Sequence, residues 1–168
     1  MANREIDNKD EIAKQVAMGA IVFNNLCENR VQNQVFDLNK ALNFQGETGP
    51  YIQYTYVRTQ SVIEKIGQVT KLETVDVQVL TDEYSQKILK LIYNFQNTLI
   101  QVTEKNEPSI LSKYLIELAK AYSSFYNENK IIVNDEKIQN TRVYLTYAVG
   151  EVLKTGAKLL GIEMPNKM

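Results

Sequence analysis

Residues 46–50 read Gly-Glu-Thr-Gly-Pro, and they mark the sharpest helix start in the chain. Either Thr48 or Gly49 suits the position that caps a helix, and Pro50 suits its first turn, where a missing N–H costs no hydrogen bond. Beyond it, apolar and small side chains recur at the spacing of one helix face. These residues are Ile52, Thr55, Tyr56, Thr59, Ile63 and Ile66. The pattern predicts a helix over about 50–67 that buries this face.

Further stretches carry apolar side chains at helical spacing, and most have a signal for their start. The first ends near Leu26 and starts at Asp7 or Asp10, the second spans about 82–102, the third begins at Pro108 and the fourth at about Asp135. A short helical turn is also expected after Asp37. Amphipathic helices joined by short connections are typical of a bundle, so the expected fold class is all-α.

The turn before the 50–67 helix is also the clearest boundary in the chain. Residues 1–48 are expected to form a short N-terminal linker segment, and residues 49–168 the main helical domain. Within the linker, residues 31–36 are interpreted as a strand-like connector. Residues 68–80 are rich in β-branched side chains but show little amphipathicity, so no helix or strand is predicted there.

The composition excludes several kinds of chemistry. The chain has no histidine, which removes Ser-His-Asp and Cys-His catalysis and histidine-ligated metals. The single cysteine, Cys27, allows neither an internal disulfide nor a multi-cysteine metal site, and it favours a reduced, cytoplasmic setting. Phosphate-binding glycine loops are absent as well. We therefore expect no catalytic residue, no metal site and no ATP activation from these residues.

Charge and hydropathy limit the expected partners. No apolar run reaches the length of a transmembrane helix, and the first ten residues are too polar for a signal peptide, so no membrane partner is expected. The formal net charge is −1, which argues against a nonspecific polyanion binder. A local patch that reads a few unpaired bases remains compatible with this charge.

Tyr51, Tyr54 and Arg58 form a second stripe on the 50–67 helix, roughly 100° from the apolar face. Two phenol rings and a guanidinium outside the core can stack unpaired bases and hold a phosphate. The alternative is a partly buried tyrosine pair beside a surface arginine. Spacing alone leaves both interpretations open.

Residues 46–58 resemble the start of the anticodon-binding domain of arginyl-tRNA synthetases, whose pattern runs acidic-Gly-x-Thr-Gly-Pro-Tyr-x-Gln-Tyr-x-x-x-Arg. Other stretches resemble the same family in the same order. They are residues 19–26, 29–30, 35–38, 41–44, 114–120, 123–127, 152–156, 159–162 and 164–168. The resemblance covers about residues 12–168 and fails only before them and around 68–82.

The resemblance implies a DALR-type, C-terminal fragment of a bacterial arginyl-tRNA synthetase, a helical bundle that recognises the anticodon of tRNA(Arg). The parent, a class I arginine–tRNA ligase of protein biosynthesis, uses ATP and Mg²⁺ in a catalytic domain that this fragment lacks. The implied partners are tRNA(Arg) and that catalytic domain of the same chain, in a monomeric, cytoplasmic parent. The implied anticodon contacts are Tyr51, Tyr54, Arg58, Tyr126, Lys167 and Met168.

Two other interpretations were weighed. A helical protein-interaction domain without RNA binding accounts for the bundle and the small net charge, but it gives no reason for the Tyr51, Tyr54 and Arg58 stripe. An independent small enzyme is disfavoured because histidine and a nucleotide loop are absent. On spacing alone, Tyr126 suits the core and a binding site equally. The basic patch is also thin, because no second basic residue follows Arg58 before Lys65.

Overall fold

The computed structural model describes residues 8–33, 35–67 and 72–168. Over these residues the chain forms α-helices and short 3-10 helices and no strand. The α-helices are α1 (Lys9–Leu26), α2 (Leu38–Ala41), α3 (Gly49–Ile66), α4 (Glu83–Lys105), α5 (Ser109–Glu128) and α6 (Glu136–Leu159), and the 3-10 helices are η1 (Leu72–Thr74) and η2 (Val77–Val79). The predicted all-α class is confirmed.

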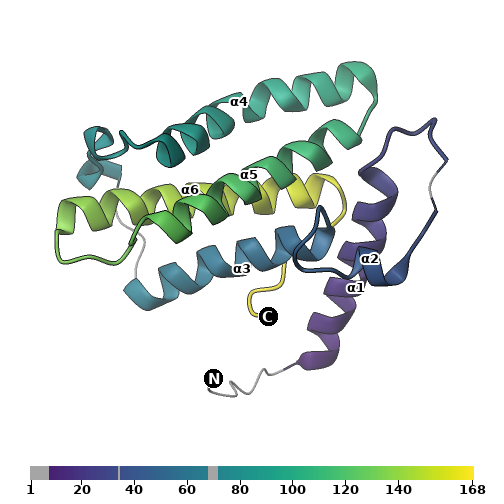
Figure 1. The fold of residues 1–168 in the computed structure, drawn as a ribbon, viewed down its shortest axis with the longest axis horizontal. Coiled ribbons are helices and arrows are strands. Elements are labelled where there is room, and N and C mark those ends of the chain that lie inside the picture. Colours follow the sequence, from purple (N-terminus) through teal and green to yellow (C-terminus); the bar gives the residue numbers. More distant parts are fainter. Residues whose placement is uncertain (1–7, 34, 68–71) are drawn as a thin grey trace.

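The long helices form a bundle, with α1 set across one end (Figure 1). α5 packs against α3, α4 and α6, and α3 is contacted by α1, α5 and α6. After α6, residues 160–168 (here called the tail) turn back and end beside α3 (Figure 1). One helix, α3, therefore meets the linker, the bundle and the tail.

The start of α3 follows from its local sequence. The Thr48 hydroxyl oxygen accepts a hydrogen bond from the Tyr51 N–H at 3.2 Å, so Thr48 rather than Gly49 is the cap. Pro50 lies in the first turn, as predicted. The helix ends before Gly67, whose φ of 81° is a left-handed conformation that glycine adopts without steric cost.

Aspartates cap three of the other helices. Asp37, Asp82 and Asp135 each accept hydrogen bonds from backbone N–H groups one turn ahead, at the starts of α2, α4 and α6. Partial burial raises the pKa of Asp82, but hydrogen bonds from Ser85 and Asn129 outweigh it and lower the pKa below its ordinary value. The predicted starts of these helices are confirmed, whereas α4 runs further than predicted, to Lys105.

The core is centred on α5. The apolar stripe of this helix is completely buried and consists of Leu111, Leu115, Leu118, Tyr122 and Phe125. On α3 the predicted face is confirmed up to Thr59, but Ile63 and Ile66 are only half-buried. Val57 and Val62 are buried as well, because several elements cover α3 from different sides.

The two connectors differ from expectation in different ways. Residues 31–33 and 35–36 contain no strand, so the strand-like interpretation is wrong over the described part of that segment. Residues 72–80 contain η1 and η2, which are too short to show a hydrophobic period. The rest of the 68–80 connector, residues 68–71, lies outside the described residues.

Candidate nucleic-acid interface

The Arg58 guanidinium lies between two tyrosine rings. Its Cζ is 4.8 Å from the centre of the Tyr54 ring and 5.0 Å from the centre of the Tyr126 ring. Tyr54 comes from the preceding turn of α3, and Tyr126 from the last turn of α5. Both distances fall within the range of about 6 Å over which a ring face attracts a cation. We call Tyr54, Arg58 and Tyr126 the arginine–tyrosine cluster.

Arg58 forms no salt bridge with any residue in the described ranges. The guanidinium carries a positive charge and several N–H donors. Ring faces leave its N–H donors unused, whereas a bidentate carboxylate would occupy them. The cluster therefore holds a positive charge in place while keeping its donors available.

Tyr51 and Tyr54 have different surroundings although they share one stripe of α3. The Tyr51 hydroxyl donates to the Ser123 Oγ of α5 at 3.1 Å, and the half-buried ring packs against the core. Tyr54, in contrast, is open to solvent, with 42% of its surface exposed. Tyr51 thus joins α3 to α5, and Tyr54 offers an aromatic face to a ligand.

Tyr126 packs near a buried aromatic residue of its own helix, α5. Its ring centre is 6.2 Å from that of Tyr122, which is fully buried. Burial raises the pKa of Tyr122 well above its ordinary value, more than the neighbouring Arg58 charge lowers it. Tyr122 therefore stays neutral, and the second ring of the cluster rests on rigid packing.

The two predicted residues of the tail lie beside α3 but not in the cluster. The Lys167 Nζ is 3.6 Å from a carboxylate oxygen of Glu64, and both side chains are exposed. Met168 is half-buried against the core. The structure thus brings Tyr54, Arg58 and Tyr126 together, with Tyr51 alongside, and among the described residues no hydrogen bond, ion pair or ring interaction joins these four to Lys167 or Met168.

Sequence reasoning did not select Ser123 as a site residue. This serine fixes the Tyr51 hydroxyl and lies one turn before Tyr126 on α5. The signal was its position in the Ser123-Ser124-Phe125-Tyr126 stretch, where a small polar residue precedes a site tyrosine by a helical turn.

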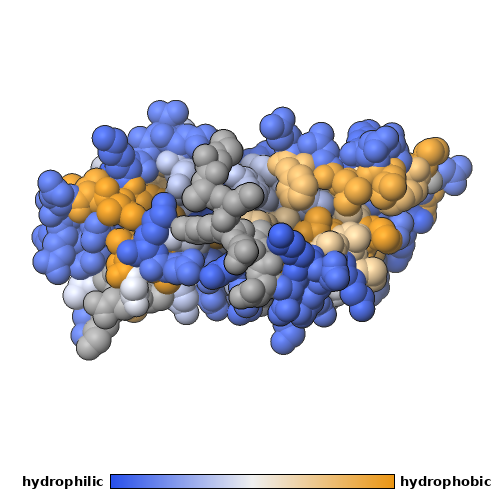
Figure 2. All heavy atoms as spheres, turned by 90° about the horizontal axis from the view of Figure 1, so that it is seen from below, coloured by the Kyte–Doolittle hydropathy of each residue, from blue (hydrophilic) through white to orange (hydrophobic). Residues whose placement is uncertain are grey.

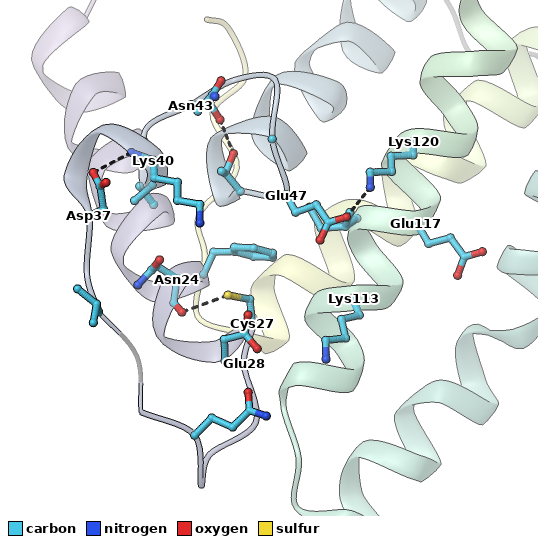
Figure 3. Close-up of a pocket in the computed structure, with 18 of the residues that line it drawn as sticks. Asn24, Cys27, Glu28, Asp37, Lys40, Asn43, Glu47, Lys113, Glu117 and Lys120 are labelled. Carbon is cyan, nitrogen blue, oxygen red and sulfur yellow. Dashed lines mark hydrogen bonds and ion pairs between the residues drawn. The ribbon is translucent and has the colours of Figure 1, made fainter.

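The structure also has a cavity of about 900 Å³ between α5 and the segment from α1 to the start of α3 (Figure 3). Charges of both signs line it: Lys40, Lys113, Lys120, Glu28, Asp37, Glu47 and Glu117. Lys120 forms an ion pair with Glu47 (Figure 3). The one aromatic residue that lines the cavity, Phe23, is buried. The cavity offers neither the exposed rings nor the cationic excess of an RNA site.

The described ranges lack two further kinds of feature. No helix there is long and apolar enough to cross a membrane. Those same ranges hold no group of three or more histidine, cysteine, aspartate or glutamate side chains placed to bind a metal ion.

Comparison with known proteins identifies the family behind this geometry. Residues 52–168 match the model of the DALR anticodon binding domain. The chain belongs to this family. The resemblance found in the sequence is therefore confirmed, whereas the roles of the individual site residues stay predictions.

The relatives are longer than this chain. An arginine–tRNA ligase of Halothermothrix orenii is 47% identical over 167 residues, which are 99% of this chain and 29% of that protein. One from Alkaliphilus metalliredigens is 39% identical over 166 residues, with the same coverage. The arginyl-tRNA synthetase of Thermus thermophilus has a similar structure, with a TM-score of 0.89 and 29% identity over 99% of this chain and 29% of its own. The chain thus spans 29% of the length of these relatives.

Proposed function

We propose that this chain binds the anticodon loop of tRNA(Arg) as one module of a longer arginine–tRNA ligase. The observation that carries the proposal is the arginine–tyrosine cluster, in which a cation with no acidic partner among the described residues lies between two rings at the surface. Membership of the DALR anticodon-binding family supports the proposal independently.

The geometry suits unpaired bases. Arg58 lies over one face of the Tyr54 ring and one face of the Tyr126 ring, and a splayed base would stack on the exposed Tyr54 ring. The free donors of Arg58 would then bond a phosphate or a base edge. Lys167 would exchange its exposed pairing with Glu64 for a phosphate, and Met168 would contact a base from the tail.

The ligase reaction itself belongs, in this proposal, to the part of the longer protein that the chain does not span. That part would hold ATP and Mg²⁺ and join arginine to tRNA(Arg). The present chain, in which we propose no catalytic residue, would supply recognition of the anticodon. We propose a monomeric, cytoplasmic parent enzyme.

We also propose that residues 1–48 link the module, residues 49–168, to the catalytic domain. Apolar residues gather at the end of the molecule where α1 and α2 lie (Figure 2). Val31 and Val35 are 83% and 91% exposed, and Phe36 and Leu38 are about half exposed. Contiguous apolar surface of this kind is typical of an interface with another domain.

This linker surface can be checked by hydrogen exchange in the longer enzyme and in the present chain. We expect residues 31–44 to exchange more slowly in the longer enzyme, because the catalytic domain would cover them. α5, which is buried in both forms, is the internal control. Equal exchange of residues 31–44 in both proteins would contradict this interface.

The anticodon proposal is tested by a gel shift with tRNA(Arg) and with a tRNA for another amino acid, over a range of salt concentrations. We expect tRNA(Arg) to bind at least about tenfold more tightly, which corresponds to about 1.4 kcal/mol. An isolated anticodon stem-loop of tRNA(Arg) should retain this preference. Equal binding of both tRNAs would contradict recognition of the tRNA(Arg) anticodon, and binding of neither would favour a domain that binds protein rather than RNA.

A further inference from the structure

Gln53 is fully buried on α3, between α1 and the tail. Its Nε2 donates one hydrogen bond to the carbonyl of Gln15 at 3.0 Å and another to the carbonyl of Glu163 at 2.8 Å. Because both partners are acceptors, the group between them must supply two N–H donors, as an amide does. Fully buried amides are uncommon and need such partners to offset their desolvation.

Two glycines make room for this junction. A Cβ at Gly19 would lie 2.6 Å from the Gln53 Nε2, and a Cβ at Gly49 would lie 2.2 Å from the Gly19 carbonyl oxygen. Both distances are far below normal contact, so any larger residue would displace the amide or push α1 from α3. The junction is therefore built closely around one side chain.

Beyond Glu163 the tail stays on α3. Pro165 is buried, and Met164 and Met168 pack against the core. Lys167 reaches Glu64 on α3. Within the described residues, the Gln53 amide donates the only side-chain hydrogen bond that a tail backbone carbonyl accepts.

We propose that Gln53 is a positioning residue, which holds the tail beside α3 so that Lys167 and Met168 meet the same RNA as the arginine–tyrosine cluster. Gln53 cannot touch RNA itself, because none of its surface is exposed. The Gln15 carbonyl lies inside α1 and keeps its helical hydrogen bond without Gln53, whereas the Glu163 carbonyl would lose its Gln53 partner, which favours release of the tail to water. This inference rests on the proposed anticodon function and adds to it the hydrogen bond that keeps the tail ordered beside α3.

The test uses Gln53→Met, which keeps the length and volume of the side chain but removes both donors. Nuclear magnetic resonance order parameters are measured for the tail amides and for α5. In Gln53→Met we expect the tail values to fall from about 0.85, typical of rigid backbone, to below about 0.6, with α5 unchanged. Gln60→Met is the matched control, because Gln60 lies on the same helix and its amide donates a hydrogen bond to the adjacent Thr59 rather than to the tail.

The second measurement is affinity for the anticodon stem-loop of tRNA(Arg). We expect Gln53→Met to weaken binding about tenfold, the scale set by loss of a charged contact. In a Lys167→Ala/Met168→Ala background the same substitution should change affinity by less than about twofold, because the contacts it positions are gone. A general packing defect would weaken binding equally in both backgrounds.

Each result bears on one proposal. A rigid tail in folded Gln53→Met overturns the positioning role, and so does unchanged affinity despite a loose tail. If the wild-type chain does not bind the stem-loop, the anticodon proposal fails, while the order parameters still decide whether Gln53 holds the tail. Should Gln53→Met not fold, Gln53→Asn replaces it, since its amide is one methylene too short to reach both carbonyls, and the same results are expected.

Discussion

Replacing Tyr54 and Arg58 together by alanine is expected to remove most of the affinity for tRNA(Arg) while changing the melting temperature little. Tyr54 is exposed, and Arg58 is held by ring faces rather than by a buried network. A base stacked on an aromatic side chain contributes about 1–3 kcal/mol to binding. Substitutions at surface positions usually change stability by less than about 0.5 kcal/mol, with about 0.5–1 kcal/mol more for an exposed cation–π contact.

Salt dependence separates the two side chains. Each phosphate contact to a single strand contributes about 0.7 to the slope of log affinity against log salt concentration, so Arg58→Ala should flatten the slope by about that amount. Tyr54→Ala should weaken binding and leave the slope unchanged, because stacking releases no counterions. Gel shifts at several salt concentrations measure both quantities.

A matched control is Tyr93→Ala, which removes an 82% exposed tyrosine from α4. This variant should bind tRNA(Arg) as the wild type does. If the folded Tyr54→Ala/Arg58→Ala variant also retains full affinity, the anticodon assignment for α3 is wrong.

Tyr51 needs a milder substitution than its neighbours. Because its ring is half-buried and its hydroxyl bonds Ser123, Tyr51→Ala would mix lost packing with lost stacking. The sequence pattern predicts the same exposure for Tyr51 and Tyr54, since helical spacing reports only the angle of each residue around the axis of its own helix. It does not report that α5 reaches one of the two and leaves the other open.

Local signals predicted the local structure well. The start of α3 at Pro50 depends on atoms within one turn, so the sequence alone was sufficient to find it, although it left Thr48 and Gly49 open as the cap. The inward face of α5 could also be predicted from the sequence, because that helix is central and its apolar stripe is complete. The half-burial of Ile63 and Ile66 could not be predicted in this way, because it depends on which neighbouring elements cover the end of α3.

The site depended on contacts between distant parts of the chain. The amide of Gln53 meets carbonyls 38 and 110 positions away, and no local period encodes that pairing. Resemblance to a family supplied Tyr126 as a candidate, but its contact with Arg58, which lies on another helix, emerged only from the packing of α3 on α5. The same limit explains why spacing left the role of Tyr126 open.

The adjacent residues Phe125 and Tyr126 are expected to give opposite phenotypes. Phe125 is fully buried, so Phe125→Ala should lower the free energy of unfolding by about 3–5 kcal/mol through lost burial and the cavity it leaves. Tyr126 is half-buried and forms one side of the arginine–tyrosine cluster. Tyr126→Ala should therefore lose less stability but about 1–3 kcal/mol of tRNA binding.

Urea unfolding and stem-loop binding, measured on both variants under conditions where each is folded, compare these effects directly. Tyr126→Phe is the control for the ring: it keeps the face that meets Arg58, and it should bind nearly as the wild type does. If Tyr126→Ala loses as much stability as Phe125→Ala and its folded form binds RNA normally, Tyr126 is a core residue. Arg58 would then keep Tyr54 as its one RNA-facing ring, and the site would have to be sought along the exposed side of α3 rather than between α3 and α5.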